Sequence, residues 1–312
     1  MWLRNRAGFL RYLITALMLK TASVFPSFYR LIGNQLGVKK RLKDGIPSYY
    51  GRRAKDFLLW YSKYEMLHDG DAVLEVGTGW VHFESIVMRL FYDVRATLFD
   101  VWDNRQLDAL KKYAVQLEGL LGQELDLTST QRGRIRSLIN AIAKVDSFES
   151  LYQLLNFRYL VNPRGTLDAL PANFFQLVYS NNVLEHIELP IASRLITDIS
   201  RVLKPGGYSC HEIDLTDHLI SFGGILNLPP KFYMVFSERI WKTFFENRVQ
   251  YINRIQCSEW LQIFQRAGLE LVEKDIVTKP VDATTLSRAY RQMDRLDIEC
   301  CRLRVVHRKP LV

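Results

Sequence analysis

The segment 71–80, with the sequence DAVLEVGTGW, constrains the fold more than any other part of the chain. Residues 72–76 are mostly apolar and predict a short buried strand. The glycine turn at 77–79 follows, and a helical pattern then runs from Trp80 to Tyr92. A strand that enters a helix through a glycine turn is typical of an α/β domain with a parallel sheet.

This turn also predicts a site for a nucleoside ligand. Glycine lets the backbone approach a ligand closely, and the N-terminus of the following helix offers free N–H groups. A second strand at 95–99 ends in Asp100, and an acid at that place is positioned to hold ribose hydroxyls. The dehydrogenase pattern G-x-G-x-x-G would need a glycine at position 82, where this chain has His82, so that class is disfavoured.

Further segments continue the alternation of strands and helices. They are a buried strand at 174–180, a helix that ends near 203, a turn at 204–207, a strand at 208–213, a helix at 258–267 and final strands at 269–277 and 301–306.

Four ordered motifs make the chain similar to the class I S-adenosylmethionine-dependent methyltransferases. They are LEVGTG at 74–79, LFD at 98–100, VYSNNVLEHI at 178–187 and RVLKPGG at 201–207. The resemblance implies a transferase of class EC 2.1.1 with S-adenosyl-L-methionine as cofactor. It also implies an α/β fold, with a Rossmann-like, seven-stranded, mostly parallel sheet, helices on both faces and an antiparallel last strand.

The same resemblance implies which residues bind the cofactor. The turn wraps the methionine part, Asp100 holds the ribose, and two asparagines flank the reacting end. The cofactor-binding residues are thus expected to be Glu75, Gly77, Thr78, Gly79, Asp100, Asn181 and Asn182. A third glycine that is common in the family is replaced by Val81, which keeps a non-catalytic scaffold as an alternative.

Within this superfamily, the chain most resembles members from bacterial surface-polysaccharide gene clusters. Those proteins carry a G-T-G-W turn, a D-x-x-D-H segment, an N-R-[IL] segment and a Glu-Trp pair. The corresponding residues are at 77–80, 214–218, 253–255 and 259–260.

The net charge of +9 is concentrated at the N-terminus. Residues 1–70 hold 13 basic and 4 acidic side chains, whereas residues 71–312 hold 29 of each. We therefore expect a basic, helical N-terminal extension at 1–70 and a methyltransferase domain at 71–312. Within the domain, 118–160 is expected to be a helical insertion and 215–256 an acceptor-site cap. Because the domain is neutral, we expect no nucleic-acid partner.

The N-terminal extension predicts an amphipathic helix. Its apolar residues recur three and four positions apart at Leu10, Leu13, Ile14, Leu17 and Met18, and basic residues such as Arg4 and Arg11 lie on another side. Three interpretations remain open: a helix docked on the domain, a peripheral membrane contact through residues 1–43, or a targeting peptide.

Histidines and acids gather near the predicted carboxyl ends of the strands, where α/β sheets bind ligands. A neutral imidazole takes a proton from a hydroxyl acceptor, and a neighbouring carboxylate orients it. Candidate pairs are His211 with Asp214 or Asp217, and His186 with Glu185. The residues expected to be catalytic are His186, His211, Asp214 and His218.

Each of these histidines also has a structural interpretation. His186 could cap the following helix, and the alternation along a strand decides which way His211 points. The same group of acids and histidines includes potential metal ligands, but no tight spacing such as HExxH occurs, so we expect no metal.

These observations together predict O-methylation of a sugar, glycan or glycolipid intermediate. A small-molecule metabolite as acceptor is the alternative. The four cysteines form no CxxC motif, and no uncharged apolar run reaches 18 residues. A reducing compartment and a cytoplasmic protein, at most peripheral on the inner face of the membrane, are therefore expected. The sequence specifies neither the acceptor atom nor the oligomeric state.

Overall fold

The structure is a computed structural model that describes residues 6–225 and 227–311, with the backbone alone for residues 26–32. Arg4, which belongs to the expected basic segment, lies outside the described residues.

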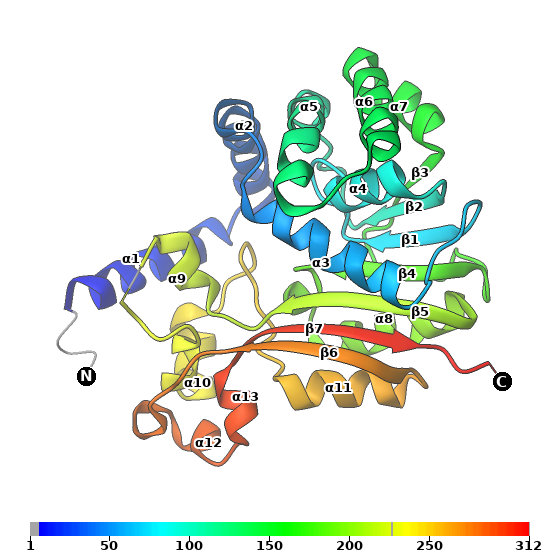
Figure 1. The fold of residues 1–312 in the computed structure, drawn as a ribbon. Helices are drawn as coiled ribbons and strands as arrows, with labels where there is room; N and C mark the ends of the chain where they lie inside the picture. The colour runs from blue at the N-terminus through cyan, green and yellow to red at the C-terminus, as the bar shows by residue number, and fades with distance from the viewer. Residues whose placement is uncertain (1–5, 226, 312) are drawn as a thin grey trace. The chain divides into compact units, whose positions relative to one another are not determined.

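Seven strands form one sheet in the order β3-β2-β1-β4-β5-β7-β6 (Figure 1). The strands are β1 (Ala72–Val76), β2 (Arg95–Asp100), β3 (Phe157–Val161), β4 (Phe175–Asn181), β5 (Leu203–Asp214), β6 (Glu270–Thr278) and β7 (Cys300–Arg308). The pairs β1–β2, β1–β4 and β2–β3 are parallel. Leu215 bonds to Cys301, whereas the earlier residue Gly206 bonds to the later residue Lys309. The two strands therefore run in opposite directions, and β7 is antiparallel to β5. The seven-stranded, mostly parallel α/β fold is therefore confirmed.

Helices connect these strands. The longer ones are α1 (Arg6–Ala22), α2 (Pro26–Asp44), α3 (Tyr49–Lys63), α4 (Phe83–Phe91), α5 (Leu107–Glu124), α6 (Ser129–Lys144), α7 (Phe148–Leu155), α8 (Leu189–Val202) and α11 (Cys257–Arg266). The shorter ones are η2 (Leu184–His186), α9 (His218–Gly223), η3 (Phe232–Val235), α10 (Glu238–Ile240), the π-helix η4 (Trp241–Phe245), η5 (Ala283–Thr285), α12 (Arg288–Arg291) and α13 (Arg295–Glu299).

Two expected boundaries differ from the observed ones. Residues 157–160, which were expected to be helical, belong to β3, because the chain re-enters the sheet there beside β2. The segment 204–207, which was expected to be a turn, already belongs to β5, where the Gly206 N–H donates to the carbonyl of Lys309.

The chain divides into two compact units that are interleaved in sequence. The first comprises 1–32, 181–197 and 211–307, and the second comprises 33–180, 198–210 and 308–312. The expected division into an extension at 1–70 and a domain at 71–312 stays a prediction.

Helix α1 packs into the first unit through a face that the sequence did not indicate. Tyr12, Ala16 and Leu19 are buried with apolar residues of η3 and η4. Phe232 lies 5.0 Å from the Tyr12 ring, edge to face. The five residues of the expected apolar face are instead exposed, with exposed fractions from 38 to 68%: Leu10, Leu13, Ile14, Leu17 and Met18. We call these five residues the α1 stripe.

The α1 stripe arises because this helix is apolar on two opposite faces, and only one of them contacts the rest of the unit. Arg6 and Arg11 are exposed on the same helix. In the described part of the chain, no helix combines the length and apolar character needed to cross a membrane.

Candidate active site

The glycine turn after β1 is held by backbone hydrogen bonds in the second unit. The N–H groups of Gly77 and Thr78 donate to the carbonyl of Phe99, over 2.8 and 3.2 Å. Gly77 and Gly79 have positive φ angles of 76° and 62°, which residues with a Cβ rarely adopt. A Cβ added at Gly79 would meet no heavy atom within 4 Å, so the backbone there borders open space that a ligand can approach.

Asp100, at the end of β2, is oriented toward this turn. Its Oδ2 accepts a hydrogen bond from the Gly79 N–H at 3.0 Å, and its Oδ1 accepts one from the Val101 N–H at 2.8 Å. Burial raises the pKa of Asp100, although these backbone N–H groups lower it in part. A carboxylate has about four acceptor sites, and the N–H groups of Gly79, Val101 and Trp102 do not use all of them.

The side chains of Glu75 and Thr78 point into a buried network beneath the turn. The Thr78 hydroxyl donates to Glu75 Oε2 at 3.1 Å, and Ser85 donates to the same oxygen. His82 Nδ1 lies 2.7 Å from the Thr78 hydroxyl. Burial lowers the pKa of His82 to about 3, so this ring is neutral. The turn therefore offers a ligand its backbone, while these side chains fix its shape.

Helix α2 covers the tryptophan that follows the turn. The Arg41 guanidinium lies 4.0 Å from the centre of the Trp80 ring, and Trp80 Nε1 donates to Asn34 Oδ1 at 3.1 Å. Arg41 also donates to Gln106 Oε1 at 3.0 Å. These contacts tie the end of α2 to the edge of the glycine turn.

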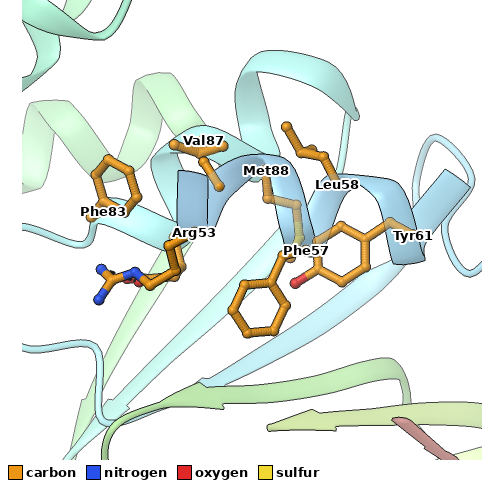
Figure 2. A pocket seen from close by; sticks show the side chains of 9 residues that line it. Arg53, Phe57, Leu58, Tyr61, Phe83, Val87 and Met88 are labelled. Carbon is orange, nitrogen blue, oxygen red and sulfur yellow. Dashed lines mark ion pairs between the residues drawn. The ribbon is translucent and has the colours of Figure 1, made fainter. Parts of the chain in front are cut away.

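A separate pocket lies between α3 and α4 of the same unit, where Figure 2 shows apolar side chains from both helices. Arg53 and Glu84 form an ion pair at one side. Burial, and then the charge of Glu84, raise the pKa of Glu75 to about 8. The pocket thus borders the network beneath the turn and contains none of the expected site residues.

Two asparagines end β4 in the first unit. Asn181 is the last residue of the strand and is half-buried, whereas Asn182 is exposed. Asn182 has a positive φ of 52°, and its N–H donates to the carbonyl of Glu212 at 3.0 Å. Its backbone is therefore fixed at the strand end, while its side chain stays accessible.

Four titratable side chains form what we call the Glu185 cluster: Glu185 and His186 of η2, Asp214 at the end of β5 and His218 at the start of α9. The rings of His186 and His218 lie 4.8 Å apart between their centres. His218 Nε2 is 3.5 Å from Asp214 Oδ2. Glu185 is 2% exposed, and its carboxylate oxygens have no hydrogen-bond partner among the described residues.

Burial shifts the proton affinities in this cluster. Burial, and next the charge of Asp214, raise the pKa of Glu185 well above its usual value, and nearby backbone amides offset this only in part. Burial opposes ionisation of Asp214, but His218 and Thr216 lower its pKa overall. The surrounding protein and His218 lower the pKa of His186 to about 4, although part of that ring faces solvent.

A later segment of the same unit holds η2 in place. The Asn253 side-chain amide donates to the carbonyls of Leu184 and Ile187, each at 2.8 Å, and its N–H donates to the carbonyl of Glu185. His186 Nδ1 lies 2.7 Å from the Tyr251 carbonyl. A carbonyl only accepts, so Nδ1 carries the proton and Nε2 keeps its lone pair.

His211 does not join the Glu185 cluster. Its ring is fully buried and stacks on Phe264 with 5.4 Å between centres, and burial lowers its pKa to about 3. Side chains alternate along a strand, so His211 and Asp214 project from opposite faces of β5. Asp217 accepts hydrogen bonds from the Tyr12 hydroxyl at 2.7 Å and the Leu219 N–H at 3.0 Å. The expected pairing of His211 with either acid is therefore replaced by the pair of His218 with Asp214.

The family model described as a methyltransferase domain matches residues 47–274, which is most of the chain. This range contains the glycine turn, Asp100 and the Glu185 cluster. The chain belongs to the methyltransferase domain family. It is an S-adenosylmethionine-dependent methyltransferase, of class EC 2.1.1, and S-adenosylmethionine is its cofactor.

Several solved structures resemble the methyltransferase. A SAM-dependent methyltransferase from Methanosarcina mazei is 13% identical, with a TM-score of 0.45, over 80% of this chain and 98% of that one. An S-adenosylmethionine-dependent methyltransferase from Mesorhizobium loti is 17% identical, with a TM-score of 0.41, over 80 and 97%. Phosphoethanolamine N-methyltransferase 2 from Haemonchus contortus is 12% identical, with a TM-score of 0.45, over 81 and 52%. A search of curated proteins gave no match.

The second unit of the methyltransferase fits its cofactor. Open space at Gly79 would admit a ligand next to the backbone, and the Asp100 carboxylate keeps acceptor capacity that ribose hydroxyls could use. Trp80 adds a large apolar surface beside the turn, with 41% of it still exposed.

Some residues that position the candidate site carry no local signal in the sequence. Asn34 and Arg41 of α2 were treated only as part of a basic extension. Asn253 was noted as part of a motif, but its bracing of η2 requires knowing that residues 68 positions apart are in contact. Such contacts depend on the tertiary fold rather than on local spacing.

Proposed function

We propose that this methyltransferase methylates a hydroxyl of a sugar, glycan or glycolipid intermediate. The observation that carries the proposal is the Glu185 cluster, which groups two imidazoles and two carboxylates after β4 and β5. A hydroxyl must lose its proton when it accepts a methyl group, and such groups are suited to remove it.

The second unit would hold the cofactor. Gly77 and Gly79 bind it through backbone, Glu75 and Thr78 fix the shape of the turn, and Asp100 binds the ribose. When bound, S-adenosylmethionine supplies an electrophilic methyl group. Asn181 and Asn182 are proposed to flank the reacting end.

His218 is the proposed general base. Asp214 lies 3.5 Å from its Nε2 and would stabilise the imidazolium that forms. His186 presents a lone pair on Nε2, because its Nδ1 donates to the Tyr251 carbonyl. His211 has no part in this step, since its buried ring stacks on Phe264.

The acceptor class rests on the motifs shared with proteins of surface-polysaccharide gene clusters. Asp214 and His218 of the D-x-x-D-H segment belong to the Glu185 cluster, and Asn253 of the N-R-I segment braces it. Motifs far apart in sequence thus serve one site.

We further propose that the enzyme works at the inner face of a membrane, where lipid-linked acceptors reside. The α1 stripe exposes five large apolar side chains, and Arg6 and Arg11 on the same helix suit an anionic lipid surface.

Mass spectrometry of surface glycans and lipid-linked intermediates tests the acceptor class. Cells that carry the gene should contain a species heavier by one methylene than cells without it. Restoring the gene with His218→Ala should leave the lighter species in place. Unchanged glycan and lipid masses, together with methylation of a free metabolite, would replace this proposal by the small-molecule alternative.

A further inference from the structure

Glu185 is a buried carboxylate that lacks a counter-group. It is 2% exposed, and both carboxylate oxygens are without a hydrogen-bond partner in the part of the chain that the structure describes. Buried carboxylates are normally paired with a cation or bound by several donors, because losing hydration is costly. A cation bound next to the Glu185 carboxylate would therefore supply the counter-charge that this side chain lacks.

Two imidazoles lie next to this carboxylate. One potential ligand atom from each of Glu185, His186 and His218 lies within 4.8 Å of the others, in a search of the described residues. Ligand bonds of about 2.0–2.2 Å place two ligands of one ion at most about 4.4 Å apart. A small rotation of these side chains would bring all three ligand atoms within bonding distance of one metal ion.

The surroundings prepare these histidines to act as ligands. His186 Nδ1 is 2.7 Å from the Tyr251 carbonyl, which leaves Nε2 deprotonated and fixes the ring. His218 has the Asp214 carboxylate 3.5 Å from its Nε2. Metal-binding histidines generally donate their second nitrogen to a carbonyl or a carboxylate in this way.

We propose that Glu185, His186 and His218 bind a divalent first-row transition-metal ion, such as zinc, manganese or cobalt. Two imidazoles and one carboxylate suit these ions better than magnesium, which prefers oxygen ligands. Three protein ligands leave coordination positions open for water or a substrate oxygen.

The location of the site suggests what the ion does, and this part rests on the proposed function. An acceptor hydroxyl bound in an open position would have its pKa lowered by the ion, and the proton that it loses would pass to solvent water. His186 and His218 would then act as ligands, and the ion would replace an imidazole as the agent that activates the acceptor.

Cobalt binding to the full-length protein tests the site without any activity measurement. The protein is stripped with a chelator and titrated with Co²⁺ alone, and visible absorption and metal content are recorded. We expect about one equivalent to bind with a visible spectrum. Glu185→Gln and His218→Ala should abolish that spectrum, and Asp214→Asn should weaken binding by roughly ten- to a hundredfold.

His68→Ala is the matched control, because His68 is an exposed histidine outside the cluster and should bind like the wild type. Thermal unfolding of each variant checks that it is folded. No visible spectrum in the wild type, or equal binding by His218→Ala and His68→Ala, would overturn the proposal. If Co²⁺ binds but no glycan is methylated, the proposed acceptor fails and the metal site stands.

Discussion

Asp100 holds the glycine turn in shape, and the same side chain is proposed to bind a ligand. Its two oxygens accept hydrogen bonds from Gly79 and Val101, which fixes the turn and leaves acceptor sites on the same carboxylate. An acid after the second strand is a local signal, so a ligand-binding role for Asp100 could be predicted from sequence, and that role stays a prediction. The burial that raises the pKa of Asp100 could not be predicted from sequence, because it depends on how the whole unit packs.

Replacing Asp100 by alanine should weaken cofactor binding. Hydrogen bonds to a charged group are worth about 1.5–3 kcal/mol, so we expect the Kd for S-adenosylhomocysteine to rise roughly ten- to a hundredfold. Isothermal titration calorimetry measures this directly. Asp126→Ala, at an exposed loop acid, is the control and should bind normally. Equal affinities for the two variants would remove Asp100 from the cofactor site.

Asp217 gives a pH dependence of stability. Burial raises its pKa from 3.8 to about 6, although Tyr12 and Leu219 bond to its charged form. An acid whose folded pKa is raised stabilises the protein below its unfolded pKa, and this stability is lost as the pH rises through the folded pKa. The loss between pH 4 and 7 is about 3 kcal/mol, at 1.36 kcal/mol per pKa unit.

Asp217→Asn should remove that dependence while keeping an acceptor for the Tyr12 hydroxyl. Urea unfolding of both proteins between pH 4.5 and 7 should show the variant gaining stability relative to the wild type as the pH rises. A constant difference across this range would mean that Asp217 titrates normally in the folded protein.

At the scale of elements, α1 has two apolar faces, of which one is buried in the core and the other is exposed. Periodicity identified a helix and its richest apolar face, but packing uses the opposite face, where Tyr12 reaches Asp217. The spacing of residues cannot tell which of two apolar faces meets the core. Because only one face packs against the core, the other face, the α1 stripe, stays exposed and is available for a binding partner.

The α1 stripe should bind anionic membranes. Leu10 and Leu17 are 58 and 68% exposed, and replacing both by glutamate adds charge where a bilayer would be. We expect co-sedimentation with phosphatidylglycerol vesicles to fall at least tenfold, equivalent to about 1.4 kcal/mol. Leu311→Glu is the control, because Leu311 is an equally exposed leucine outside α1. Equal sedimentation of the two variants would exclude the stripe as a membrane contact. Deleting residues 1–43 is a less specific test, because it also removes Tyr12 from the core.

At the scale of the whole molecule, the motifs predicted the fold because their order determines the order of strands in the sheet. They could not predict the units, because these are built from distant pieces of chain. Helix α1 shares a core with residues of 211–307, and Leu286 and Ile298 lie in the same apolar cluster as Ala16. Only part of the Glu185 cluster could be predicted from the sequence. Its members follow strand ends, but their pairing required the fold.

The segment 71–312, although it carries every sequence motif, should therefore not be stable alone. Tyr12 is fully buried in a core that this segment would leave open. Tyr12→Ala in the full chain should cost about 3–5 kcal/mol of unfolding free energy, and the truncation at least as much. Leu17→Ala, on the exposed side of the same helix, should change stability by no more than about 0.5 kcal/mol. A cooperative unfolding transition of normal midpoint for 71–312 would contradict this.

Because the first unit is built from segments far apart in the chain, its core can form only late in synthesis. Helix α1 is synthesised before the segments that bury Tyr12, which lie about 200 residues further along the chain. At about 5–20 residues per second, α1 waits roughly ten seconds or more for its partners. During that wait both of its apolar faces are uncovered. A nascent chain with such a helix would have time to meet a lipid surface before its own core closes, and the order of synthesis would then assist the membrane contact proposed for the α1 stripe.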